Sequence, residues 1–180
     1  PTNPWQPFLM KLDLAGRELA RASPHKSTGP ITVAALRGSG VPQLLVPCGD
    51  GTLLELDANL NLVQRVSVVR QDYDWVNLHI AGVRDLDEDG QPEIILGSSQ
   101  LEFVSGTNPG RSEGEANVRR LHDNSVIVLD CHLRPRARRV IHAQEAQASF
   151  AVMQADTSPA GPAAILALDQ KVTVLRYQPR

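Results

Sequence analysis

The sequence has little of what marks several common protein classes. It contains two cysteines in 180 residues, 4% aromatic residues and a formal net charge of −2. It holds no apolar run of about 18 residues, so we expect no membrane-spanning helix. The near-neutral charge provides no field that would attract nucleic acid or a membrane surface. Cys48 and Cys131 allow one disulfide, but free thiols that pack as small apolar groups are the expected state.

Motifs of the common enzyme classes are also missing. The chain has no Gly-x-Ser-x-Gly, no HExxH and no phosphate-binding glycine loop. Its histidines are scattered: His25, His79, His122, His132 and His142. The locally basic stretch RPRARRVIH at 134–142 falls on an expected outer hairpin without interleaved aromatic residues, so it does not indicate nucleic-acid binding.

What the chain does contain is a recurring hairpin pattern. Four segments begin with an apolar, strand-like run that ends in Leu-Asp, or in Leu-Arg in the last case; they start at Phe8, Leu53, Val126 and Val172. A second strand-like run follows in the first three, which predicts a β-hairpin. The marker residues recur at roughly 45-residue spacing, with one longer interval. They are Asp13, Asp57, Asp130 and Arg176.

A second unit precedes three of these hairpins. It consists of an apolar strand, a loop rich in Gly, Pro or Asp, and a short continuous apolar run, and it starts at Ile31, Leu78 and Phe150. Continuous apolar runs suit strands that are buried on both faces. Four strands per roughly 40–50 residues are typical of a β-propeller blade. We therefore predict an all-β fold, a partial β-propeller of four-stranded antiparallel blades, with an open sandwich or solenoid as the alternative.

The predicted units cover the chain as one β-propeller segment, of about three blades or part of a larger propeller. They are an outer half-blade of two strands at 5–22, blades of four strands at 31–70 and 77–142, and a partial blade of three strands at 149–180. The long interval indicates an insertion between Ser98 and Asn124. Within this insertion the segment 112–122 suggests one or two helical turns at most.

The segment VRDLDEDGQPEIIL, from Val83 to Leu96, is densely acidic. Side chains at alternate positions of a tight loop converge on one point, and a glycine at the sixth position permits the sharp turn. Ca²⁺ takes six to eight oxygen ligands of this kind. An EF-hand is not expected, because its twelfth position is Leu96 and the flanks read as strands. The expected ligands are the side chains of Asp85, Asp87, Asp89 and Glu93 and the backbone carbonyl of Gln91.

The stretch GVRDLDEDGQPEIILG resembles an FG-GAP repeat of integrin-α-like propellers and of bacterial VCBS-type repeats. The resemblance covers Leu78–Gly97 and implies one structural Ca²⁺ between the two inner strands of a blade. Two other stretches, GDGTLLELD at 49–57 and DNSVIVLD at 123–130, resemble the strand motif of quinoprotein-like propellers. They support the architecture without implying a quinone cofactor.

The corresponding loops of the other units depart from this pattern. RGSGVPQ at 37–43 has no acidic residue and reads as three residues shorter, and DTSPAGPAA keeps only Asp156. One cation is therefore expected, and it would fix the register of the two strands that its loop joins. The alternative is a polar turn whose carboxylates are solvated.

Ligand binding is expected at the opposite end of the strands, where the long insertion and the connections between blades gather. There the sequence offers Tyr73, Asp74 and Trp75, and the insertion adds Arg111 and Arg119. Tyr and Trp in loops favour contact with a partner or a sugar. Packing of both rings between blades is the alternative, and the insertion is either a functional loop or a decoration.

Together these features favour a non-enzymatic, calcium-stabilised propeller module that recognises a protein or glycan within a larger exported protein. The rival hypothesis is a carbohydrate-active or other hydrolytic propeller enzyme whose active site lies in missing blades. Because the chain begins at Pro1 without a methionine, we expect a mature or excised piece. The remaining blades or a second chain would complete the ring. Calcium loops of low affinity suit an extracellular or periplasmic location.

Overall fold

The computed structural model describes the backbone of residues 7–24, 29–38, 40–69, 75–105, 117–141, 151–155, 164–168 and 172–176. Side chains are described as far as Gln100, except for Trp75, and again over 124–140. In these residues every regular element is a β-strand, and all strand pairing is antiparallel. The predicted all-β class is therefore confirmed for this part of the chain.

The described residues form thirteen strands in four sheets, and within each sheet the strands lie in chain order. The two-stranded sheet contains β1 (Leu9–Leu12) and β2 (Glu18–Ala22). The first four-stranded sheet contains β3 (Thr32–Ala34), β4 (Gln43–Pro47), β5 (Thr52–Leu56) and β6 (Leu62–Ser67). The second contains β7 (Trp75–Arg84), β8 (Glu93–Ser105), β9 (Asn117–Leu129) and β10 (Pro135–Ile141). The three-stranded sheet contains β11 (Ala151–Ala155), β12 (Ala164–Leu168) and β13 (Val172–Arg176).

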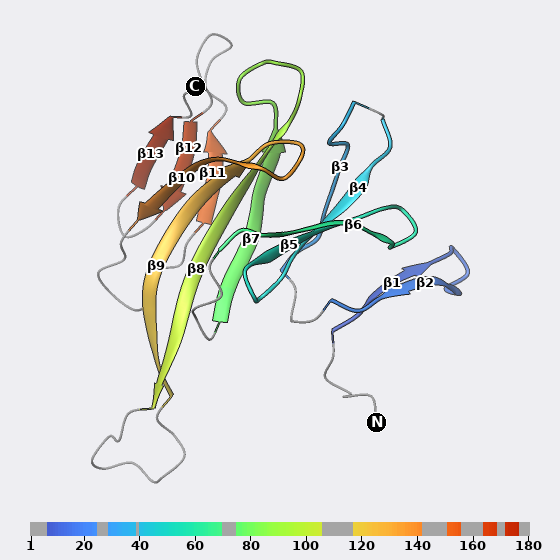
Figure 1. Cartoon of the computed structure of the whole chain (residues 1–180), viewed down its shortest axis with the longest axis horizontal. Helices are drawn as coiled ribbons and strands as arrows, with labels where there is room; N and C mark the ends of the chain where they lie inside the picture. The colour runs from blue at the N-terminus through green and yellow to red at the C-terminus, as the bar shows by residue number, and fades with distance from the viewer. Residues whose placement is uncertain are drawn as a thin grey trace.

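The expected grouping of two, four, four and three strands is thus present among the described residues. Figure 1 shows the sheets following one another across the molecule in chain order, from β1–β2 on the right to β11–β13 on the left. Strand β11 lies next to β7 and β8, so the last sheet continues the series.

The main hydrophobic core lies between the two four-stranded sheets. Leu45 and Leu53 come from β4 and β5, Leu96 and Leu129 come from β8 and β9, and all four are fully buried. The run Ile94–Leu96 is buried at every position, as expected for a strand that is covered on both faces. This core holds together the sheets that carry the loops described below.

Aspartates at the Leu-Asp marker build the hairpin turns. Asp130 is an example, because its Oδ1 accepts hydrogen bonds from the backbone N–H groups of His132 and Arg134, both at 2.9 Å. Its Oδ2 accepts a bond of 2.8 Å from Nε of Arg134. Asp13 and Asp57 accept the corresponding bonds in the turns of their own hairpins. The marker recurs in the sequence because one carboxylate satisfies three donors of each turn.

The insertion between Ser98 and Asn124 largely extends two strands. β8 and β9 are 13 residues long each and remain paired as far as Ser105 opposite Asn117. The expected helical turns are wrong over 117–122, which is strand. Figure 1 shows this hairpin running well past the neighbouring strands, at the end of the sheet opposite the β7–β8 loop. The predicted placement of the acidic loop and the insertion at opposite ends is therefore correct.

Candidate metal centre

The acidic loop joins β7 to β8 and is folded by its own carboxylates. Asp85 accepts hydrogen bonds from the backbone N–H of Asp89 at 3.1 Å and of Gly90 at 2.8 Å. Asp89 accepts one from the N–H of Gln91 at 2.8 Å. Gly90 has a φ of +85°, a conformation that glycine adopts without the steric cost of a side chain. The loop is therefore a tight turn with three aspartates at alternate positions.

Those three aspartates converge as the sequence predicted. One carboxylate oxygen from each of Asp85, Asp87 and Asp89 lies within 4.8 Å of the other two. Oδ1 of Asp87 is buried and has no hydrogen-bond partner. A buried polar atom without a partner is costly, and a cation placed among the three carboxylates would remove that cost. The cluster could thus hold a metal ion.

Glu93 stands at the start of β8 and is 4% exposed. Its Oε2 accepts a hydrogen bond of 2.7 Å from the backbone N–H of Leu86, which ties the beginning of the loop to its end. Burial raises the pKa of Glu93, and repulsion from Asp87, Asp89 and Asp85 raises it further, against the lowering effect of the Leu86 bond. The charge of the three aspartates therefore adds to the rise in the pKa of Glu93, although Glu93 is not one of the residues whose oxygens converge.

Gln91 connects the loop to the neighbouring turn. Its Oε1 lies 3.0 Å from Sγ of Cys131, so the thiol donates a hydrogen bond to the side-chain amide. Cys131 is 3% exposed, lies two residues after the end of β9 and is a free thiol, as is Cys48. The expectation of free cysteines is thereby confirmed. Any movement of the acidic loop at Gln91 would act on this buried thiol.

The β3–β4 loop repeats several features of the β7–β8 loop but contains no acidic residue. Gln43 accepts a hydrogen bond of 3.1 Å from the N–H of Leu36, and the two residues are as far apart in sequence as Glu93 and Leu86. Both leucines are buried. Residues two and four positions after each leucine have positive φ: Gly38 and Gly40 in one loop, Glu88 and Gly90 in the other. The prediction that the β3–β4 loop is three residues shorter is therefore wrong.

With the loops aligned in this way, Arg37 occupies the position of Asp87. Its guanidinium donates two hydrogen bonds of 2.6 Å to the carboxylate of Glu55 on β5. The Glu55 side chain is 0% exposed and that of Arg37 is 30% exposed. The side-chain hydrogen bond to Glu55 raises the pKa of Arg37. Sequence reasoning missed this pair, although a single acid within the apolar run TLLEL is a signal that a cation lies nearby.

The ligand-binding residues that were expected at the opposite end of the strands lie mostly outside the described part of the chain. Tyr73, Asp74 and Arg111 lie outside the described residues, as does Asp156. Trp75 is the first residue of β7 and pairs with Leu101. Arg119 lies on β9 opposite Phe103, within the extended hairpin. Only the backbone of Trp75 and Arg119 is described.

No family model, curated protein or solved structure matches the chain. The resemblance to FG-GAP and VCBS-type repeats therefore stays a hypothesis that rests on the residues of the β7–β8 loop. Among the described residues, no helix is long and apolar enough to cross a membrane.

Proposed function

We propose that this chain is a calcium-stabilised segment of a β-propeller that serves as a recognition module without catalytic activity. The observation that carries the proposal is the convergence of Asp85, Asp87 and Asp89, with one Asp87 oxygen buried and unpartnered. Two four-stranded antiparallel meanders packed face to face support the blade assignment. Their sequential strand order is the order within a propeller blade.

The ligand set favours Ca²⁺ over transition metals. Carboxylate and carbonyl oxygens are hard ligands, and no histidine or cysteine belongs to the cluster. Three aspartate side chains, the carbonyl of Gln91 and the free oxygen of Glu93 would supply five ligands. Water would then complete the six to eight oxygens that Ca²⁺ takes. Mg²⁺ prefers a smaller octahedral site and keeps several of its waters, so it is less suited to a loop that offers five protein oxygens.

A structural role for the ion follows from the position of the loop. The ion would neutralise clustered carboxylates and fix the loop between β7 and β8, two strands of the main core. It would also hold Gln91 against Cys131, next to the neighbouring sheet. None of these residues forms a nucleophile–base pair of the kind that hydrolytic enzymes need. We therefore favour recognition over hydrolysis.

The recognition surface that we propose is the far end of the second sheet. The β8–β9 hairpin extends beyond its neighbours there, opposite the metal loop, and brings Arg119 to a paired strand (Figure 1). A rigid hairpin next to loops is a common platform for binding a protein or a glycan. The remaining blades, or a second chain, would complete the ring. A location outside the cytoplasm, where calcium is abundant, suits a loop of modest affinity.

Thermal unfolding with Ca²⁺ and with a chelator tests the metal proposal. Calcium at about a hundred times its Kd would stabilise the parent by about 2.7 kcal/mol. Asp87→Asn should lose most of this gain. Glu88→Gln removes one charge from the same loop outside the cluster and should retain it. Equal melting temperatures of the parent in calcium and in chelator would contradict the proposal.

Binding screens test the recognition proposal separately. The parent and a variant in which a short turn replaces residues 101–121 would be compared on glycan and secreted-protein arrays. We expect ligands that bind the parent and not the shortened variant, while both melt at the same temperature in calcium. Turnover of a glycan by the parent, abolished by substituting an acidic residue, would instead favour the hydrolytic alternative.

A further inference from the structure

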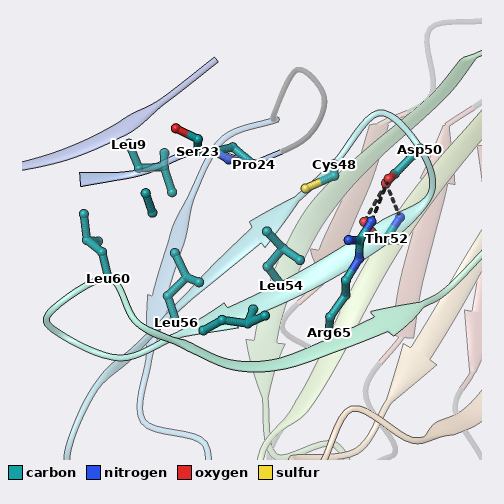
Figure 2. Close-up of a pocket in the computed structure, with 12 residues that line it drawn as sticks. Leu9, Ser23, Pro24, Cys48, Asp50, Thr52, Leu54, Leu56, Leu60 and Arg65 are labelled. Carbon is teal, nitrogen blue, oxygen red and sulfur yellow. Dashed lines mark hydrogen bonds and ion pairs between the residues drawn. The ribbon is translucent and has the colours of Figure 1, made fainter. Parts of the chain in front are cut away.

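A cavity of about 190 Å³ lies between the β1–β2 hairpin and the first four-stranded sheet. Figure 2 shows that leucines from both sides line it and that a polar group closes one end. The hairpin side contributes Leu9 and Ala22 to its lining, and the side of the first sheet contributes Leu54, Leu56, Asp50 and Arg65. The space corresponds to roughly six water-sized groups of about 30 Å³ each.

The cavity exists because the hairpin presents small side chains to the sheet. Ala20 and Ala22 of β2 face this interface together with Leu9, opposite Leu54 and Leu56 of β5. Among the described residues, this cluster has four buried members, compared with twelve in the core between the two four-stranded sheets. Protein interiors are normally close-packed. A half-open apolar gap at this interface is therefore a site that a ligand can fill.

The polar end is organised around Asp50. Its Oδ1 accepts hydrogen bonds from the backbone N–H of Thr52 at 3.0 Å and from the Thr52 hydroxyl, and its Oδ2 lies 3.1 Å from Nη2 of Arg65. Burial acts to raise the pKa of Asp50, but the Thr52 bonds and the charge of Arg65 outweigh it and hold the pKa below its usual value. A charged Asp50 therefore positions the Arg65 guanidinium beside the cavity, as Figure 2 shows.

Arg65 retains capacity for an anion. A guanidinium has five N–H donors in a planar fork that matches a carboxylate. Among the described residues, Asp50 is the acceptor that it contacts, through one of these donors. The Arg65 side chain is 41% exposed, so its other donors are open to a second acceptor.

We propose that this cavity binds a small amphipathic carboxylate of about six carbons, with its apolar chain against the leucines and its carboxylate on Arg65. The chain length follows from the volume, since each methylene takes a space similar to that of a water molecule. Burial of the chain against the leucines would favour binding through the hydrophobic effect. The head group would form a paired, charge-assisted contact with Arg65. This site is independent of the metal centre.

Sodium hexanoate is the probe for this proposal, and acetate and hexan-1-ol are its matched controls. Saturation-transfer NMR on the full chain with calcium should show hexanoate bound through its methylene protons. Acetate lacks the chain and hexan-1-ol lacks the charge, so each should bind at least about tenfold more weakly, equivalent to about 1.4 kcal/mol. Equal binding of hexanoate and hexan-1-ol, or no saturation of hexanoate, would overturn the proposal.

Two substitutions locate the binding. Arg65→Gln should weaken hexanoate about tenfold and leave hexan-1-ol unchanged, while Arg21→Gln, at an exposed arginine outside the cavity, should change neither. Ala22→Leu fills the cavity from the hairpin side and should abolish both.

Alkylation of Cys48 gives a readout in the unaltered protein. Its thiol lines the cavity and is 3% exposed, so bound hexanoate should slow its reaction with N-ethylmaleimide and leave that of Cys131 unchanged. Hexanoate binding that survives Ala22→Leu, or protection of neither thiol, would refute the location.

Discussion

The β3–β4 and β7–β8 loops share a hydrogen bond across the loop and two left-handed positions, and they differ in the charges of their side chains. Each begins at a buried leucine whose N–H is accepted by the residue that starts the next strand, Gln43 in one loop and Glu93 in the other. At the position after the leucine, the first loop has Arg37 and the second has Asp87. In the first loop, the guanidinium of Arg37 forms an ion pair with the buried carboxylate of Glu55. The second gathers three aspartates and leaves one oxygen unpartnered.

The comparison indicates that the backbone turn can form without the aspartate cluster. Glycine and left-handed positions recur in both loops, so the turn does not need acidic residues. The Arg37 guanidinium balances the buried carboxylate of Glu55 in the first sheet, and the proposed cation would balance three aspartates in the second. We therefore expect metal dependence in the second sheet and metal-independent ion pairing in the first.

The largest effect is expected from breaking the ion pair of the first loop. Arg37→Met leaves the Glu55 carboxylate buried without a cation, which should cost about 3 kcal/mol in the free energy of unfolding. Denaturant unfolding in calcium measures this cost. The double variant Arg37→Met/Glu55→Leu removes both charges and should recover most of the stability. A single variant within 1 kcal/mol of the parent, on the order of a surface pair, would show that the pair is unimportant.

A smaller effect is expected when Glu93 is made to resemble Gln43. Glu93→Gln keeps an acceptor for the Leu86 N–H but removes the charge that the three clustered aspartates repel. Calcium affinity should fall about tenfold, equivalent to about 1.4 kcal/mol. In chelator, the variant should melt above the parent, because a neutral side chain relieves repulsion from the aspartates. Calorimetric titration and thermal unfolding read the two effects, and unchanged calcium affinity would exclude Glu93 from the site.

The smallest effect is expected at Cys131. Its thiol is held by Gln91 of the acidic loop, whereas Cys48 lies in the other hydrophobic cluster, away from that loop. Chelation should speed alkylation of Cys131 severalfold, by less than the roughly tenfold that corresponds to 1.4 kcal/mol, and leave the rate at Cys48 unchanged. Peptide mass spectrometry separates the two sites. Equal acceleration at both thiols would indicate global loosening, and no change at Cys131 would uncouple the loop from the turn.

Several parts of the structure were readable from the sequence because one residue type carries the local physics. The Leu-Asp marker predicted the hairpins, since the aspartate side chain satisfies the turn donors in the way that Asp130 does. The run Ile94–Leu96 predicted a strand that is buried on both faces. Alternation of Asp85, Asp87 and Asp89 before Gly90 predicted a convergent cluster.

Other parts were hidden because they depend on contacts between distant residues. The equal length of the two loops is not visible in the sequence, because Arg37 stands where the other loop has Asp87 and the two side chains carry opposite charges. The partner of Arg37, Glu55, is on another strand. The insertion was expected to be a functional loop or a decoration with one or two helical turns at most, yet residues 101–105 and 117–121 pair as antiparallel strands. Backbone hydrogen bonds between two strands can form such a ladder without the alternation of apolar residues that marks a strand in sequence.

The central claim is that one loop binds an ion and its counterpart does not. Equilibrium dialysis with ⁴⁵Ca²⁺, on the parent and on Asp87→Asn, tests this claim most directly. One bound calcium is expected per parent chain, and Asp87→Asn should lose that ion. An absence of bound calcium in the parent, or one calcium retained in Asp87→Asn with unchanged affinity, would contradict it.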